Sequence, residues 1–212
     1  GPMSYSVNEE CGLLVDAFDQ PPVIMMTYNP PYYPTFVERY GFRKARDLYA
    51  YRLQTSTFGT GGEGTPAKIQ RVADVAQRRT KVHVRKVDLP HFDRELALVK
   101  EIYNDAWSRN WGFVPMSDAE IDHLAAQLKP LLDPDVLFVA EIDDRPVGIS
   151  VSLPDMNQAF RHVRDGRLFP FGWAVFLWNR RKINCLRVTI MGVKKEYQLR
   201  GIDAIFYART IQ

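Results

Sequence analysis

The sequence predicts an α/β fold of the α+β kind. Some stretches repeat their apolar side chains with the two-residue period of a strand, and others with the 3.6-residue period of a helix. Residues 82–87 alternate polar and apolar side chains, as a half-buried strand does. Two apolar runs, 136–142 and 146–153, flank Asp143-Asp144-Arg145, which is typical of a β-hairpin. Residues 92–107 instead show the helical period, with one face formed by Leu96, Val99, Ile102, Tyr103 and Ala106.

The remaining elements follow from shorter signals. Residues 66–79 predict a short helix, and Ser117-Asp-Ala-Glu120 is a capping box that starts a second helix ending near Leu128. A helical stretch is expected over 156–163, a β-rich strand over 185–193 and a helix from Ile202. After the residue 66–79 helix, the predicted order is β, α, α, β, β, an insertion, β, α.

The aromatic segment 169–178 is the longest apolar run, and it is too short to span a bilayer. We expect a buried or interface helix here. An alternative follows from the next residues, Arg180-Arg181-Lys182: aromatics beside cations can dock on a membrane surface or hold an acyl chain. The simpler interpretation of this basic cluster, and of Arg78-Arg79-Thr80-Lys81, is a solvated helix end.

The composition indicates a globular protein and excludes several classes. The chain has 212 residues, 46% hydrophobic, with 28 basic and 25 acidic residues, a balance too even to predict a nucleic-acid surface. No metal site is expected, because the four histidines share no ligand spacing. Cys11 and Cys185 give no disulfide framework, which favours reduced thiols and a cytoplasmic location.

The N-terminus adds little to this classification. It has no basic region followed by an apolar stretch, so no secretory signal is predicted. Gly1-Pro2-Met3 is either a cleavage scar before a start Met or native sequence.

A glycine-rich stretch divides the chain. Residues 54–66 are small and polar, which predicts a flexible linker between residues 1–53 and residues 67–212. The smaller piece is below the size that usually folds alone. It contains an expected helix over 35–40, ended by Gly41, and an alternating stretch over 43–53 that predicts a strand.

The run from Met191 to Ala204 carries the clearest functional signal. It predicts a strand that feeds a turn containing Gly201 and then a helix starting at Ile202. Amide N–H groups at the start of a helix have no intrahelical partner, so they can bind an anion such as a phosphate. The alternative is a strand-to-helix connection with no ligand.

This order of elements and this turn resemble the GNAT acyltransferase superfamily. Its turn has the form Gln or Arg, two residues, Gly, one residue, then Gly or Ala; Gln198-Leu-Arg-Gly201-Ile-Asp203 matches the first two fixed positions and departs at Asp203. The hairpin over 138–148 is also typical of the family. The resemblance covers residues 82–212 and implies a mixed, mostly antiparallel sheet flanked by helices.

The resemblance also implies a domain organisation. The chain looks like the middle of a tandem GNAT protein, with residues 1–53 as the C-terminal half of one domain, contributing its late helix and strand. Residues 54–66 are the linker, and residues 67–212 are the N-terminal half of the next domain, including the turn. We expect the two halves to form a composite or circularly permuted domain, within one chain or between two.

For the site, the resemblance implies an acyl-CoA, acetyl-CoA or another, as co-substrate. Main-chain groups of the strand would hold the pantetheine and those of the turn the pyrophosphate, with Gly201 permitting close approach of the phosphate. The implied cofactor-binding residues are Met191, Val193, Gln198, Leu199, Arg200, Gly201, Ile202, Asp203 and Ala204.

Catalytic residues stay unassigned. The family's acid Tyr corresponds to Val37. Tyr32 and Tyr33, a turn earlier, are alternatives for the acid, but the expected role of each is an aromatic of the core or of a pocket wall. Glu196 lies beside the turn and is expected to point to solvent. Asp203 would repel a pyrophosphate if its carboxylate faced the turn.

Two functions follow from these features. The first is an acyl-CoA-dependent N-acyltransferase, or a fragment of one, that acetylates an unknown small-molecule or protein amine. The second is a non-catalytic GNAT-like module for interaction or oligomerisation, favoured by Val37 and Asp203 at family motif positions. We expect no nucleic-acid partner, no membrane span and a possible homodimer.

Overall fold

The computed structural model describes residue 3, residues 6–54 and residues 65–211. It forms two compact units: Gly1–Leu53 with Asp155–Cys185, and Gln54–Pro154 with Leu186–Gln212. Most of the predicted linker, residues 55–64, lies outside the described residues, as do Gly1 and Pro2.

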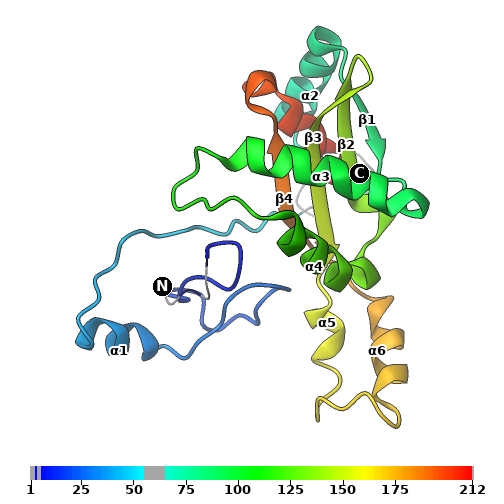
Figure 1. Ribbon diagram of the computed structural model, residues 1–212. Coiled ribbons are helices and arrows are strands. Elements are labelled where there is room, and N and C mark those ends of the chain that lie inside the picture. The colour runs from blue at the N-terminus through cyan, green and yellow to red at the C-terminus, as the bar shows by residue number, and fades with distance from the viewer. Residues whose placement is uncertain (1–2, 4–5, 55–64, 212) are drawn as a thin grey trace. The chain divides into compact units, whose positions relative to one another are not determined.

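The elements follow the predicted order closely (Figure 1). The helices are α1 (Tyr33–Arg39), α2 (Ala67–Thr80), α3 (Phe92–Trp107), α4 (Asp118–Leu128), α5 (Asn157–Phe160), α6 (Gly172–Arg180) and α7 (Ile202–Ile211). The strands are β1 (His83–Lys86), β2 (Leu137–Ile142), β3 (Arg145–Pro154) and β4 (Leu186–Val193). Short 3₁₀ turns are η2 (Leu89–His91), η3 (Lys129–Leu131), η4 (Pro134–Val136) and η5 (Lys195–Tyr197).

The second unit contains a four-stranded antiparallel sheet in the order β1-β2-β3-β4. The β2–β3 hairpin turns at Asp143 and Asp144, both with positive φ (50° and 59°), as a tight two-residue turn requires. The predicted α+β class, with an antiparallel sheet flanked by helices, is confirmed.

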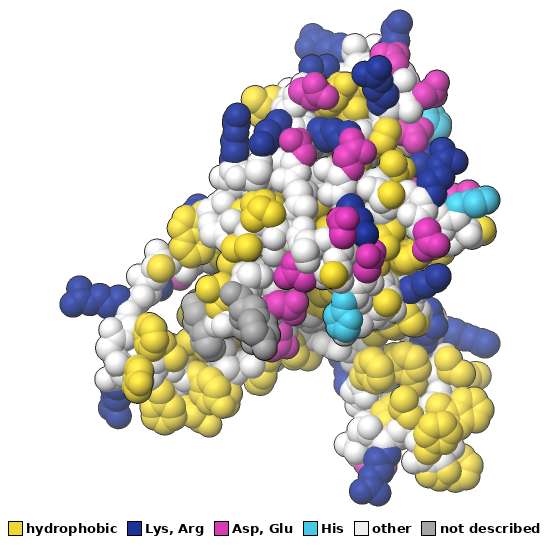
Figure 2. Space-filling view, viewed as in Figure 1, with side chains coloured by type: hydrophobic (Ala, Val, Ile, Leu, Met, Phe, Trp, Pro, Cys, Tyr) yellow, Lys and Arg dark blue, Asp and Glu magenta, His cyan; other side chains and the backbone are white. Residues whose placement is uncertain are grey.

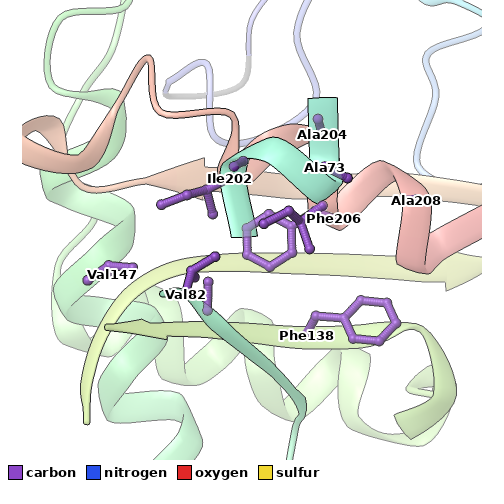
Figure 3. Close-up of a cluster of buried hydrophobic side chains, with 11 residues drawn as sticks. Ala73, Val82, Phe138, Val147, Ile202, Ala204, Phe206 and Ala208 are labelled. Atoms are coloured by element: carbon purple, nitrogen blue, oxygen red, sulfur yellow. The ribbon is translucent and has the colours of Figure 1, made fainter. Parts of the chain in front are cut away.

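Two hydrophobic clusters fix the helices on the two faces of this sheet. On one face, α3 packs Ile102 and its apolar neighbours against Val139 and Ile149. On the other face, α2 and α7 lie together over the sheet, and Phe206 of α7 is fully buried, next to Gly148 of β3 (Figure 3). The small residues Ala73 and Ala76 let α2 approach α7 closely.

Three charged side chains form an ion triad where α3 packs on the sheet. Arg85 of β1 donates from Nε to Glu141 of β2 at 2.8 Å and from one terminal nitrogen to Glu95 of α3 at 3.0 Å. Burial lowers the pKa of Arg85, but the two carboxylates more than offset this effect, so its pKa is raised. Glu95 is only 4% exposed, and Arg85 supplies the counter-ion that a buried carboxylate needs.

The predicted capping box at α4 is present. The Ser117 hydroxyl accepts from the Glu120 amide, and the Glu120 carboxylate accepts from the Ser117 amide at 2.7 Å. These bonds from the Ser117 backbone and side chain lower the pKa of Glu120. The stabilisation they contribute is therefore full above the unfolded-state pKa of Glu120 and is lost as the pH falls through its lowered, folded-state pKa.

We expect Ser117→Ala to lower the melting temperature by about 2–4 °C near neutral pH, because one orphan helix amide loses its acceptor. The difference from the unsubstituted chain should shrink as the pH falls through the lowered pKa of Glu120. Thermal melts followed by circular dichroism across that range check this; a difference that does not depend on pH would contradict the linkage to Glu120.

The first unit has less regular structure. Helix α1 confirms the helix expected over 35–40, and Gly41, with φ of 106°, ends it. Residues 22–24 bind the segment after β3, since the Ile24 amide donates to Asp155 Oδ1 at 2.9 Å and Asn157 Nδ2 donates to the Pro22 carbonyl at 2.9 Å.

Two predictions for this unit are wrong. Residues 43–53 form no strand, and their large apolar side chains Leu48, Tyr49 and Tyr51 are exposed. A strand is stabilised by a paired neighbour, and within the described residues no strand pairs with this segment. Of the two alternatives for α6, a buried or an interface helix, the buried one is wrong, because none of its residues is buried. No helix in the described part of the chain is long and apolar enough to cross a membrane.

Candidate functional site

The strand–turn–helix predicted around Gly201 is present in the second unit. Strand β4 leads through η5 into a turn in which Leu199 and Gly201 have positive φ, 61° and 79°, and α7 begins at Ile202. The Leu199 side chain is 106% exposed, so the turn projects into solvent.

The amides of this turn have no protein acceptor in the part of the chain that the structure describes. They are the N–H groups of Leu199, Arg200, Gly201, Ile202 and Asp203. The next amide, that of Ala204, donates to the Gly201 carbonyl at 3.1 Å. These unpaired donors, together with the positive end of the α7 dipole, form an arrangement that can bind an anion.

Gln198 has a positioning role in this geometry. Its side-chain Nε2 donates to the Val193 carbonyl at 3.0 Å and lies 3.5 Å from the Ala106 carbonyl oxygen. The side chain therefore ties the turn to the end of β4 and to α3.

The structure gives Gly201 a packing role in addition to the phosphate approach expected from the sequence. A Cβ at this position would lie 3.0 Å from Ala76 Cβ and 3.4 Å from Val72 Cγ1, both on α2. The positive φ of Gly201 also disfavours any side chain. Gly201 thus permits close packing of the turn against α2.

We expect Gly201→Ala to destabilise the chain by about 2 kcal/mol, from backbone strain together with overpacking against Ala76. Gly41→Ala is the matched control, because Gly41 also has a positive φ, but a Cβ added there would meet no atom within 4 Å. Urea unfolding should show a larger loss for Gly201→Ala; equal losses would mean that contact with α2 contributes nothing.

A hollow of about 640 Å³ opens between the turn and α2. Among the described residues, its walls contain three arginines, Arg71 and Arg79 of α2 and Arg200 of the turn, and no carboxylate. The remaining lining residues are Val72, Val75, Ala76, Thr80, Leu199 and Gly201. A concave surface with three cations and no acid favours an anionic ligand.

The charged residues of the turn differ in what they face. Arg200 donates to the Glu196 carbonyl at 2.7 Å, and its guanidinium lies 5.0 Å from the centre of the Tyr197 ring, so its head is held in place. Asp203 is exposed and is absent from the lining of the hollow, as is the exposed Glu196. The expected repulsion from Asp203 is therefore not directed into the hollow.

Sequence reasoning missed Arg71 and treated Arg79 as part of a solvated helix end. The two residues lie eight positions apart with Val75 midway, which places all three on one helical face. This spacing was the available signal. It did not identify a site because the opposite wall is formed by residues 199–201, far along the chain.

Strand β4 presents an open edge next to the turn, since β3 is its one paired strand among the described residues. Lys194 donates its amide to the Val147 carbonyl at 2.8 Å, which makes these residues a hydrogen-bonded pair. In an antiparallel ladder such pairs alternate with pairs whose backbone groups point outward. Met191, opposite Ser150, and Val193, opposite Gly148, therefore direct their backbone groups away from β3.

The hollow has no residue suited to proton transfer among its described lining side chains, which include no Asp, Glu, His, Cys or Tyr. Tyr32 and Tyr33 are exposed and contact each other, with ring centres 5.2 Å apart, and Val37 lies on α1. The expectation that they lie in a core is therefore wrong, and neither tyrosine lines the hollow.

No protein-family model matches the chain. The chain is 40% identical over 206 residues to a bacterial ceramide synthase of Caulobacter vibrioides, a match covering 93% of this chain and 50% of that protein. It is 38% identical over 216 residues to the protein YghO of Escherichia coli, covering 100% of this chain and 53% of that protein. The chain thus spans about half the length of these curated relatives.

Among solved structures, the chain is similar to a Drosophila melanogaster polyamine N-acetyltransferase, with 18% identity, a TM-score of 0.36 and coverage of 61% of this chain and 68% of the other. It is also similar to an agmatine N-acetyltransferase mutant in its apo form, with 16% identity, a TM-score of 0.34 and coverage of 60% and 68%.

Proposed function

We propose that this chain is the acyl-CoA-binding part of an N-acyltransferase. The observation that carries the proposal is the set of unpaired amides from Leu199 to Asp203, beside a hollow lined by Arg71, Arg79 and Arg200. A pyrophosphate is a compact, multiply charged anion, and backbone amides at a helix start together with arginines are the groups that bind such anions best. The open edge supplies the backbone groups of Met191 and the amide of Val193, whose carbonyl accepts from Gln198, for the amides of pantetheine.

The acceptor follows from the sequence relatives. A ceramide is the amide of a fatty acid and a sphingoid amine, so a ceramide synthase joins an acyl group to a long-chain amine. Since the chain is 40% identical to a protein of that name over 93% of its own length, we propose a long-chain amine as acceptor and a fatty acyl-CoA as donor. The sequence led us to expect acetyl-CoA or another acyl-CoA, and acetyl-CoA is the shorter alternative.

We also propose a domain organisation. In it, residues 1–53 are the end of one GNAT-like domain, residues 67–212 are the start of another, and the two assemble as a composite domain within one chain or across a homodimer. The coverage of about half of each relative supports the interpretation as part of a longer protein. A cytoplasmic location suits a donor carried on CoA.

A second candidate function is a non-catalytic acyl-CoA-binding or interaction module. It is favoured by the lack of a proton-transferring side chain among the described residues that line the hollow.

Two measurements separate these functions. Isothermal titration with acetyl-CoA and palmitoyl-CoA should give binding on the order of 10 µM, and mass spectrometry should detect an N-acyl product when a sphingoid amine is added. Binding without product supports the module. A folded chain that binds neither CoA ester overturns the proposal.

A further inference from the structure

A surface rich in exposed apolar residues lies in the first unit, on the segment from Asp155 to Cys185. We call this segment the aromatic hairpin. It contains α5 and α6, and Figure 2 shows hydrophobic side chains gathered over the part that Figure 1 labels with these helices. Its exposed large apolar residues are Phe160, Leu168, Phe169, Phe171, Trp173, Val175, Leu177 and Trp178.

The aromatic hairpin is an ordered element with its own internal contacts. The rings of Phe160 and Phe176 have centres 4.5 Å apart and join α5 to α6. The Asp155 amide donates to the Cys185 carbonyl at 2.9 Å, which closes the base of the hairpin. Trp173 donates from its indole nitrogen to the Pro170 carbonyl at 2.9 Å. The exposed aromatics are therefore presented by a formed structure.

Cations surround these aromatics. Between residues 157 and 182 the hairpin has one acidic residue, Asp165. The same range has six basic residues: Arg161, Arg164, Arg167, Arg180, Arg181 and Lys182. All six are exposed, and within the described residues the ion pairs of the chain involve none of them. Lys182 Nζ lies 5.8 Å from the centre of the Trp178 ring, so a cation and an indole are adjacent on one surface.

The charge pattern of the hairpin distinguishes between two possible binding partners, a second copy of the chain and a lipid surface. A symmetric contact with a second copy would place the six cations of one hairpin against the six of the other, which is unfavourable. An anionic lipid surface satisfies both features, because Trp and Phe partition into the headgroup region while Arg and Lys bind lipid phosphates.

We propose that the aromatic hairpin docks on the surface of an anionic bilayer, with Phe169, Phe171 and Trp178 inserted at headgroup depth and the Arg180-Arg181-Lys182 cluster on the phosphates. The inference rests on this hairpin alone and does not require the acyl-CoA site. It replaces the expectation of a solvated basic cluster next to a buried helix.

The apolar part is tested with the 212-residue chain and vesicles of phosphatidylcholine containing roughly 30% phosphatidylglycerol. We expect Trp178→Ser to lower the partition coefficient in co-sedimentation about tenfold, because an indole leaves the interface. Trp111→Ser is the matched control, since Trp111 is similarly exposed, 58% against 64% for Trp178, but lies in the other unit. Equal losses for both variants would overturn the proposal.

The charged part is tested with the triple variant Arg180→Gln, Arg181→Gln, Lys182→Gln. At about fivefold per cation, binding to the anionic vesicles should fall by roughly 100-fold. The control is a second triple variant, Arg78→Gln, Arg94→Gln, Arg145→Gln, which changes the net charge equally. It should weaken binding to the anionic vesicles much less. Equal effects of the two triple variants would overturn a local lipid contact.

A direct readout of insertion uses tryptophan fluorescence. Lipids brominated near the headgroup should quench the unsubstituted chain, and the quenching should weaken in Trp178→Ser. Light scattering on the same samples identifies a competing occupant: a dimer that Trp178→Ser dissociates, with vesicle binding unchanged, would show that the surface joins two copies and would overturn the proposal.

Discussion

Replacing Arg71 and Arg79 together by glutamate is expected to weaken CoA binding by at least about 100-fold. Each arginine that pairs with a phosphate contributes on the order of 1.5–3 kcal/mol, so loss of both removes more than about 3 kcal/mol before the repulsion from the new carboxylates is counted. Both side chains are exposed on α2, so the substitutions leave the contact between α2 and α7 intact. Isothermal titration with CoA measures the effect.

Arg78→Glu is the matched control for this variant. Arg78 lies on the same helix, does not line the hollow and donates to the Asp74 carbonyl at 3.1 Å. We expect it to retain CoA binding within a fewfold. If Arg78→Glu weakens binding as much as the double variant does, the interaction is a general effect of net charge and the hollow is not the site.

Arg85→Met is expected to cause the largest loss of stability, about 3–5 kcal/mol. This substitution removes the partner of Glu95, which is 4% exposed, and also one hydrogen bond to Glu141. A buried carboxylate without its counter-ion costs several kcal/mol, whereas the intact pair contributes little net stability. Denaturant unfolding followed by tryptophan fluorescence checks the value.

The double variant Arg85→Met, Glu95→Leu separates the two explanations for that loss. Removing both charges should recover most of the stability, because no buried charge is then left unpaired. A double variant as unstable as Arg85→Met would show that packing of the Arg85 side chain, and not the uncompensated Glu95, accounts for the effect.

Local signals in the sequence predicted most of the second unit. The bounds of α3 follow from one apolar face, and the start of α4 follows from Ser117 and Glu120, because both depend on residues close in sequence. The turn before α7 was also predicted. These elements are stabilised by hydrogen bonds between residues close in sequence and by an apolar face that packs on the core. A local pattern of residue types specifies both features.

Features that depend on distant partners were not predicted. The alternation over residues 43–53 indicates a strand, but a strand also needs a neighbour, and the sequence does not say whether one is present. The apolar character of α6 suggested burial, yet the same composition suits an exposed surface. The role of Gly201 depends on Ala76, and the hollow combines α2 with the turn, so neither was visible in residue spacing alone.

The proposed function depends on the amides from Leu199 to Asp203 binding the pyrophosphate of an acyl-CoA. Amide nitrogen and proton chemical shifts of these residues, measured by NMR with and without CoA, test it most directly. We predict large shifts at these five amides with CoA and none with adenosine, which lacks the phosphates. Saturable CoA binding that shifts amides elsewhere in the chain and leaves these five unchanged would contradict the account.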